Sequence, residues 1–211
     1  MEAMNGRPEL CREVPQGAEL RVAELYWEAF GRKLGPALNP PEKARAFIAR
    51  HLHRDRGVTA LVDGRVVGVA GYQLDGRALT GGGARDVLAA YGAFAGLPRL
   101  ALLALFERRA RPAELTMDGI VVAPGQRGAG IGGLLLQAIA AIAAEHGRDR
   151  IRLDVIDVNP RARALYERHG FAATRTRRTP WLRDLLGFGA VTTMHRPVTS
   201  ADLPAPREAT P

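Results

Sequence analysis

The sequence predicts a single α/β domain, and three of its features support that fold class. Residues 120–122 form a short β-branched run, and apolar residues then recur every three or four positions from Ile131 to Ile142, which predicts a strand followed by a helix with one buried face. Residues 58–62 and 65–72 are two further β-branched runs, joined by Asp63-Gly64, a pair that favours a tight hairpin turn. A chain of 211 residues of which 46% are hydrophobic can also bury a full core.

The remaining elements follow from the same periodicities, taken in chain order. Branched runs predict strands, apolar residues at helical spacing predict helices, and proline or glycine marks the breaks. The expected elements are a strand at 9–14, helices at 18–32 and 41–54, the hairpin at 58–72, two apolar helices at 84–95 and 98–109, a strand at 113–122, a helix from 131, a strand and a helix within 151–171, a strand at 172–177, a turn or helix at 180–186, and a strand at 190–194.

A glycine-dense loop joins the strand at 120–122 to the helix that follows it. Gly128, Gly130, Gly132 and Gly133 fall within six residues, so the backbone can adopt conformations closed to other residues and bring successive N–H groups against a ligand. These N–H groups lie at a helix start, where they lack intrahelical partners and the helix dipole favours negative charge. The loop therefore predicts a phosphate-binding site, with a plain strand-to-helix turn as the alternative.

The phosphate could belong to more than one kind of ligand. Gly128-x-Gly130-x-x-Gly133, with Asp154 about 20 residues further on, also matches the dinucleotide-binding fingerprint. That motif should open a series of βαβ units, whereas an antiparallel hairpin precedes the loop here and one strand-helix unit follows it.

Two motifs in the second half of the chain together resemble a known superfamily. Arg127-x-x-Gly130-x-Gly132 follows a strand, and Asn159 is followed seven residues later by Tyr166 and then by Gly170-Phe171. This arrangement is similar to the GNAT superfamily of acyl-CoA-dependent N-acyltransferases. The resemblance implies a mostly antiparallel sheet that is splayed at its centre and flanked by helices.

The resemblance also implies how acetyl-CoA, as cosubstrate, would be held. Backbone amides would bind its pyrophosphate, and its pantetheine arm would pair like a strand with the edge of the sheet. Asn159 would hydrogen-bond the arm, and Tyr166 would protonate the departing thiolate. The residues implied for the pyrophosphate are Arg127, Gly128, Ala129, Gly130, Ile131, Gly132 and Gly133, and those beside the arm are Ile120, Val121 and Val122.

Asn159 and Tyr166 also have structural interpretations that involve no ligand. Asn159-Pro160 favours a helix start, with Asn as the N-cap and Pro at the first helical position. Tyr166 fits an amphipathic core position with its hydroxyl at the surface. A thiol has a pKa of about 8.5 and a phenol of about 10, so a tyrosine hydroxyl can also protonate a nascent thiolate. Both interpretations stay open for each residue.

Asp118 is the carboxylate nearest in sequence to the expected transfer site, and Glu114 is the second candidate. An acceptor amine must lose a proton before it attacks a thioester, which makes Asp118 a candidate general base. Because an aspartate pKa of about 3.9 lies far below that of an ammonium group, this role requires burial or a water relay. A strand-edge or turn-capping role is the alternative. Gly119 predicts a bulge that separates this strand from its neighbour.

Residues 74–112 depart from the family pattern, which usually has a direct turn between the third and fourth strands. We expect a helical insertion there. The apolar run from Val87 to Phe106 approaches the length of a membrane span, but Pro98 and Arg99 interrupt its centre, so no membrane insertion is expected. Two helices that cover the acceptor cleft, or that lie at a homodimer interface, account for the same apolar surface.

Composition narrows the remaining function classes. The formal net charge of +8 comes almost entirely from arginines spread along the chain, which suits a phosphate-bearing ligand better than a nucleic acid. Cys11 is the only cysteine, so an intrachain disulfide is ruled out and a cytoplasmic location is favoured. A single cysteine in an N-terminal strand also favours direct acyl transfer over a route through an acyl-cysteine. Only His51-x-His53 pairs two histidines at short spacing, so no metal site is expected.

These observations predict an acetyl-CoA-dependent N-acetyltransferase that acts on a primary amine. One domain would span residues 1–197, and the proline-containing residues 198–211 would form a disordered tail. A non-catalytic acyl-CoA-binding sensor is the alternative, since it would share the loop and Asn159. A dinucleotide-binding oxidoreductase is the third hypothesis.

Overall fold

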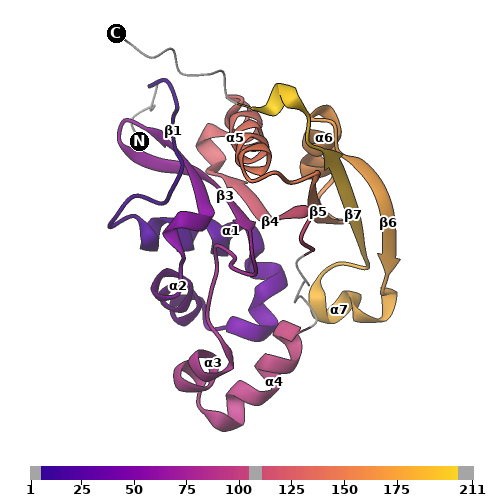
Figure 1. Cartoon of the computed structure of the whole chain (residues 1–211). Helices are drawn as coiled ribbons and strands as arrows, with labels where there is room; N and C mark the ends of the chain where they lie inside the picture. The colour runs from indigo at the N-terminus through magenta and orange to yellow at the C-terminus, as the bar shows by residue number, and fades with distance from the viewer. Residues whose placement is uncertain (1–5, 105–110, 204–211) are drawn as a thin grey trace.

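The computed structural model describes residues 6–104 and 111–203 as a seven-stranded sheet with helices on both faces (Figure 1). The strand order is β1-β2-β3-β4-β5-β7-β6, and every neighbouring pair is antiparallel except β4 and β5. The strands are β1 Glu9–Cys11, β2 Gly57–Val62, β3 Arg65–Gln73, β4 Glu114–Val122, β5 Arg150–Ile156, β6 Ala172–Arg178 and β7 Ala190–Pro197. The helices are α1 Glu19–Leu38, α2 Pro41–Arg50, α3 Ala84–Tyr91, α4 Ala93–Ala104, α5 Ile131–Glu145, α6 Pro160–Arg168 and α7 Arg183–Leu186. The mostly antiparallel sheet and the helical insertion between the third and fourth strands are confirmed.

The sheet is splayed between β4 and β5, as the sequence predicted. These two strands pair only at their first residues, where 114–116 lie beside 150–152. Beyond that point β4 stays paired with β3, while β5 stays paired with β7 along its whole length. The parallel pair therefore opens into a gap toward the carboxyl end of β4.

A bulge in β4 lies at the start of this gap. Gly71 of β3 faces Gly119, and the next residue, Tyr72, faces Met117, so Asp118 is an extra residue on β4. Such a bulge bends the strand and re-aims the side chain it carries. The sequence predicted a bulge from Gly119, and the extra residue is its neighbour.

Glycines allow the helices to approach the sheet closely on each face. A Cβ atom at Gly68 would lie 3.1 Å from Ile131 Cγ2 and 3.3 Å from Leu135 Cδ1, both on α5. A Cβ atom at Gly119 would lie 2.9 Å from Phe30 Cε2 on α1. The helices α1 and α5 thus pack closely against β4 and β3 from opposite faces of the sheet.

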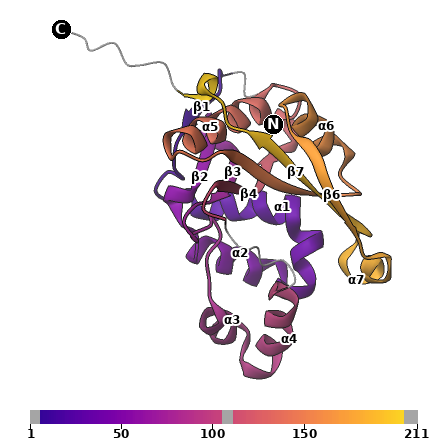
Figure 2. The same cartoon turned by 45° about the vertical axis from the view of Figure 1, so that its right-hand side comes forward.

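The insertion packs against the N-terminal helices rather than against the sheet. Figures 1 and 2 show α3 and α4 projecting on the side of α1 and α2, away from α5 and α6. Apolar contacts form a second, smaller core whose buried members are Ala37, Leu38, Ala44, Phe47 and Val87, and the Tyr91 hydroxyl also donates to the Leu38 carbonyl at 2.6 Å.

The break between the two inserted helices differs from our prediction. We placed it at 96–98, but α3 ends at Gly92, whose φ of 79° ends a right-handed helix at no steric cost. Pro98 instead lies inside α4. The end of the second predicted helix, at 105–110, falls outside the described residues. Within the described part of the chain, no helix combines the length and apolarity that crossing a membrane requires.

Other boundaries moved by a few residues. The hairpin turn is as predicted, with Asp63 at φ 50° and Gly64 at φ 71°, both positive as a type I′ turn requires. The helix predicted at 18–32 continues to Leu38, and the one predicted to reach 54 ends at Arg50. Part of the predicted tail is a short 3₁₀ turn at 200–202, and 204–211 lie outside the described residues.

Candidate functional site

The loop between β4 and α5 presents a row of backbone N–H groups at a helix start. Gly128 has a φ of 93°, and Gly130, the residue that caps α5, has a φ of 78°. The backbone hydrogen bonds of the described chain engage none of the N–H groups of residues 128–132. Residues 127–130 are exposed, and a Cβ atom at Gly128 or Gly130 would meet no atom within 4 Å. Of the predicted residues 127–133, residues 128–132 therefore form an open cradle of donors that suits an anion, while the N–H groups of Arg127 and Gly133 donate to the carbonyls of Pro124 and Gly130.

The last two glycines of the loop serve packing rather than backbone conformation. A Cβ atom at Gly132 would lie 3.0 Å from Leu165 Cδ2, and one at Gly133 would lie 3.0 Å from His169 Nε2. Leu165 lies on α6 and His169 is the C-cap of that helix, so these glycines bring the first turn of α5 against α6. The sequence could not separate this role from the conformational role of Gly128 and Gly130.

The side chain of Arg127 ties the loop to its surroundings. Its Nε donates to the carbonyl of Val122 at 3.0 Å. Its Nη2 lies 3.4 Å from Glu28 Oε1 on α1. The guanidinium thus links the end of β4 to the N-terminal helix and fixes where the cradle begins.

Beyond Thr116, one edge of β4 has no strand beside it among the residues that the structure describes. Ile120, Val121 and Val122 pair on one side with Ala70, Val69 and Gly68 of β3. On the other side, in the part of the chain that the structure describes, β4 pairs with β5 no further than Thr116. An unpaired strand edge can hydrogen-bond an extended ligand. The predicted contact of these three residues with the cofactor arm stays a prediction.

The helix α6 carries the other two predicted residues. Asn159 is its N-cap, and its Oδ1 accepts a hydrogen bond from the Ala162 N–H at 3.2 Å. Tyr166 is buried, with its ring centroid 5.8 Å from that of Phe171. Asn159 is therefore an N-cap and Tyr166 occupies a core position, and their proposed contacts with a cosubstrate stay predictions.

A cavity of about 690 Å³ lies beside the bulge of β4. Its wall comes from α1, α2, the segment 76–84 and the two inserted helices, and it is largely apolar. Asp118 lines this cavity, and its Oδ2 accepts a hydrogen bond from the Leu79 N–H at 3.0 Å. The insertion reaches the cavity through Val87, Leu100 and Leu103.

Glu114 belongs to a different environment. It is buried, with Oε1 3.3 Å from Arg150 Nε and 3.7 Å from His195 Nε2, and it is not a lining residue of the cavity. Burial lowers the pKa of His195 below its usual range, although the Glu114 carboxylate acts in the opposite direction. Glu114 is therefore not at the site where we expected a second base. Among residues 6–104 and 111–203, no cluster of three or more His, Cys, Asp or Glu side chains is arranged to hold a metal ion.

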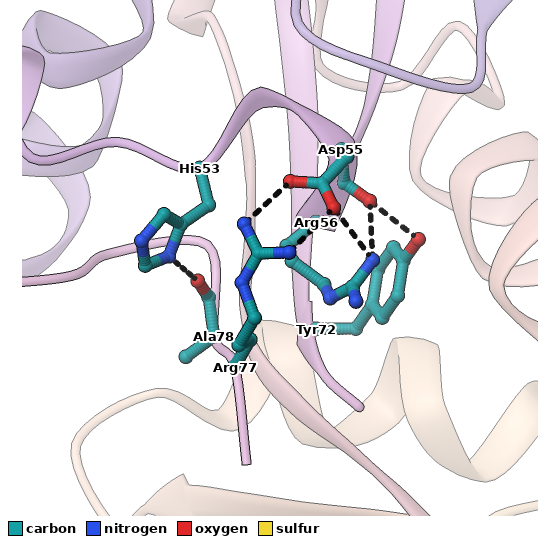
Figure 3. Close-up of polar contacts among 6 residues, drawn as sticks. All are labelled: His53, Asp55, Arg56, Tyr72, Arg77 and Ala78. Carbon is teal, nitrogen blue, oxygen red and sulfur yellow. Dashed lines mark hydrogen bonds and ion pairs between the residues drawn. The ribbon is translucent and has the colours of Figure 1, made fainter. Parts of the chain in front are cut away.

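His53 is a lining residue that sequence reasoning missed. Its Nδ1 lies 2.7 Å from the carbonyl oxygen of Ala78, a contact drawn in Figure 3. We had considered His53 only as a partner of His51 for a metal. His53 lines the cavity because residues 52 and 80, on two different loops, form an antiparallel bridge. No local sequence pattern predicts such a contact.

Comparisons with known proteins agree with this geometry. A streptothricin acetyltransferase of Streptomyces lavendulae is 46% identical over 59 residues, which are 28% of this chain and 31% of that protein. The chain thus matches about a third of the length of that relative. Among solved structures, a GCN5-related N-acetyltransferase from Kribbella flavida has a TM-score of 0.59 at 17% identity, covering 90% of this chain and 97% of that one.

A second solved structure, the ribosomal-protein-S18-alanine N-acetyltransferase from Escherichia coli, has a TM-score of 0.54 at 18% identity. That match covers 97% of this chain and 99% of the other. At such identities these structures establish the fold. The model of the acetyltransferase (GNAT) family matches residues 20–171. The chain therefore belongs to the acetyltransferase (GNAT) family.

Proposed function

We propose that the chain transfers the acetyl group of acetyl-CoA to a primary amine held in the cavity beside Asp118. The observation that carries this proposal is the row of N–H groups at residues 128–132, at the start of α5 and next to the unpaired edge of β4. A diphosphate requires several convergent donors, and a helix N-terminus supplies both the donors and a favourable dipole. An extended amide-containing arm requires a free strand edge. One ligand that combines both features is coenzyme A.

Each predicted residue has a defined task in this proposal. Acetyl-CoA supplies an acyl group activated as a thioester. Backbone amides of 128–132 bind its diphosphate, the edge at 120–122 pairs with its arm, and an amide near Ile120 polarises the carbonyl. Asn159 hydrogen-bonds the arm, and Tyr166 gives its hydroxyl proton to the departing thiolate. Asp118 supplies a carboxylate to the wall of the cavity that receives the amine.

The cavity favours a compact acceptor with an apolar body and an amine at one end. Its volume of about 690 Å³ lies in the range of small-molecule sites, which are about 300–1,000 Å³. The matching segment of a streptothricin acetyltransferase makes streptothricin the first amine to test. A useful panel adds spermidine, a lysine-containing peptide and a peptide with an N-terminal alanine.

The test is thiol release from acetyl-CoA with each amine of the panel, together with calorimetric titration of coenzyme A. We expect binding at one site and amine-dependent thiol release that Tyr166→Phe reduces without weakening coenzyme A binding. Coenzyme A binding without turnover on any amine would instead favour the acyl-CoA sensor. Binding of NADH with no binding of coenzyme A would favour the dinucleotide hypothesis.

The homodimer and the cytoplasmic location also remain predictions. Apolar residues of α3 and α4 are buried against α1 and α2, which supports the interpretation of the insertion as a cleft cover. Phe94 and Leu97 on α4 are 99% and 62% exposed, which leaves surface for a second copy. Light scattering across a concentration series measures the oligomeric state directly.

A further inference from the structure

One peptide group lies between two titratable side chains at the cavity. The carbonyl oxygen of Ala78 is 2.7 Å from His53 Nδ1, and the N–H of Leu79 donates to Asp118 Oδ2 at 3.0 Å. This carbonyl and this N–H belong to the same peptide bond. His53 and Asp118 both line the cavity, together with other polar residues such as Gln73, Arg77 and Thr80, so the peptide connects two of the polar groups of its wall.

The contact with Ala78 determines the tautomer of His53. A backbone carbonyl can only accept, so Nδ1 must carry the hydrogen, and in the neutral ring Nε2 then holds a lone pair. Figure 3 shows the second ring nitrogen of His53 pointing away from Ala78. Among the described residues no hydrogen bond occupies Nε2. His53 thus presents an available proton acceptor at the cavity.

Several contacts hold this imidazole in place. The backbone N–H of His53 donates to the Leu79 carbonyl at 2.8 Å. The guanidinium of Arg77 lies 3.3 Å and 3.4 Å from the two carboxylate oxygens of Asp55, which anchors the segment that carries Ala78 (Figure 3). A Cβ atom at Gly81 would lie 2.7 Å from the ring Cε1, so the ring is closely flanked there.

We propose that His53 Nε2 is the proton acceptor for the acceptor amine, and that Asp118 is a positioning residue which acts through the Ala78–Leu79 peptide. This inference rests on the proposed function. A carboxylate that accepts the peptide N–H polarises the peptide, and hydrogen bonds in such a chain strengthen one another. The polarised Ala78 carbonyl then binds the Nδ1 hydrogen more strongly and holds the ring in the tautomer whose Nε2 can accept a proton.

The proton balance of the step is complete. The bound ammonium gives one proton to His53 Nε2, and the free amine attacks the thioester carbonyl carbon. A C–N bond forms, the C–S bond breaks, and the thiolate takes a proton from the Tyr166 hydroxyl. The amide nitrogen loses its second proton, which restores Tyr166 through water, and His53 releases its proton to solvent. Histidine is also the side chain that enzymes use most often for general acid-base catalysis.

The tautomer can be tested without any acceptor. Protein labelled with ¹⁵N-histidine gives distinct signals for a protonated and an unprotonated ring nitrogen, and the signal missing from His53→Gln assigns His53. We expect Nδ1 protonated and Nε2 unprotonated in the wild type and in Asp118→Asn, whose amide oxygen can still accept from Leu79, and a mixture of tautomers in Asp118→Ala. A wild-type His53 protonated at Nε2 overturns the inference.

The kinetic test uses the panel amine on which the wild type is fastest. General-base catalysis typically contributes about 10²–10⁴-fold, so we expect His53→Ala to lower kcat by about 100-fold or more, and added imidazole to restore part of it. Asp118→Asn should keep at least about a tenth of kcat. His51→Ala is the matched control, because the His51 side chain faces Asp86 at 4.0 Å and does not line the cavity.

Each outcome of the kinetic test has a clear meaning. Wild-type kcat in His53→Ala, or a loss that imidazole does not restore, overturns the role of His53. Loss of activity in Asp118→Asn equal to that in Asp118→Ala, with His53→Ala active, would make Asp118 itself the base. Coenzyme A affinity and Tm of each variant control for folding. A wild type that acetylates none of the amines refutes the proposed function instead, and the tautomer measurement still decides the geometry.

Discussion

A charge introduced at Ala129 should change coenzyme A affinity and stability in opposite directions. Ala129 is exposed and immediately precedes Gly130, the cap of α5, so Ala129→Glu and Ala129→Lys both extend into water and disturb no packing. Two unit charges about 6 Å apart in water interact by about 0.7 kcal/mol. For a diphosphate with two negative charges, Ala129→Glu should weaken the binding free energy of coenzyme A by about 1.4 kcal/mol, which is about a tenfold loss of affinity. Ala129→Lys should give about a tenfold gain of affinity.

Stability should respond the other way, because negative charge near a helix N-terminus stabilises the helix by about 0.3–1 kcal/mol. Calorimetric titration of coenzyme A at low ionic strength, where screening is weak, measures the first effect, and urea unfolding measures the second. Ala129→Ser provides an uncharged control. Equal coenzyme A affinities in the glutamate and lysine variants, with both folded, would refute a diphosphate site at this loop.

Three further predictions concern single contacts. Gly119→Ala should lower the unfolding free energy by about 1–3 kcal/mol, because its Cβ would lie 2.9 Å from Phe30 Cε2; a variant as stable as the wild type in urea contradicts this. Asn159→Ala should lower the unfolding free energy by about 1 kcal/mol, because the helix cap is lost. It should also weaken coenzyme A binding measured by calorimetry, and an unchanged affinity argues against the proposed contact with the cofactor arm. Burial lowers the pKa of His195, so protonation favours the unfolded chain. The contribution of His195 to the unfolding free energy should be fully present above a pH of about 6.5 and be lost as the pH falls through the folded pKa. Urea unfolding at several pH values should therefore give a shallower decrease for His195→Gln than for the wild type.

Local signals were sufficient for most of the fold and for the conformation of the glycine loop. The glycine loop, the β-branched run before it and the apolar spacing after it all lie within one continuous stretch. The predicted strand and the predicted helix therefore fix the two ends of the loop between them. The Asp63-Gly64 turn was equally local, because both residues need a positive φ that few other pairs tolerate. Such features depend on backbone conformation, which neighbouring residues largely determine.

Contacts between distant segments were beyond the reach of the sequence. The polar wall of the cavity joins His53, Ala78 and Asp118, which lie on two loops and a strand, and no spacing rule connects them. The role of Gly132 and Gly133 likewise depends on α6, more than 30 residues away. The prediction placed the break between α3 and α4 at 96–98 instead of Gly92, because Gly96 and Pro98 together give a stronger local signal than a single glycine.

A crystal structure of the chain with coenzyme A tests the central claim most directly. We predict diphosphate oxygens within hydrogen-bond distance of the N–H groups of residues 128–132, and the pantetheine arm along the free edge at 120–122. Density for the diphosphate at another surface, or an unchanged loop at a saturating concentration of coenzyme A, would contradict the account.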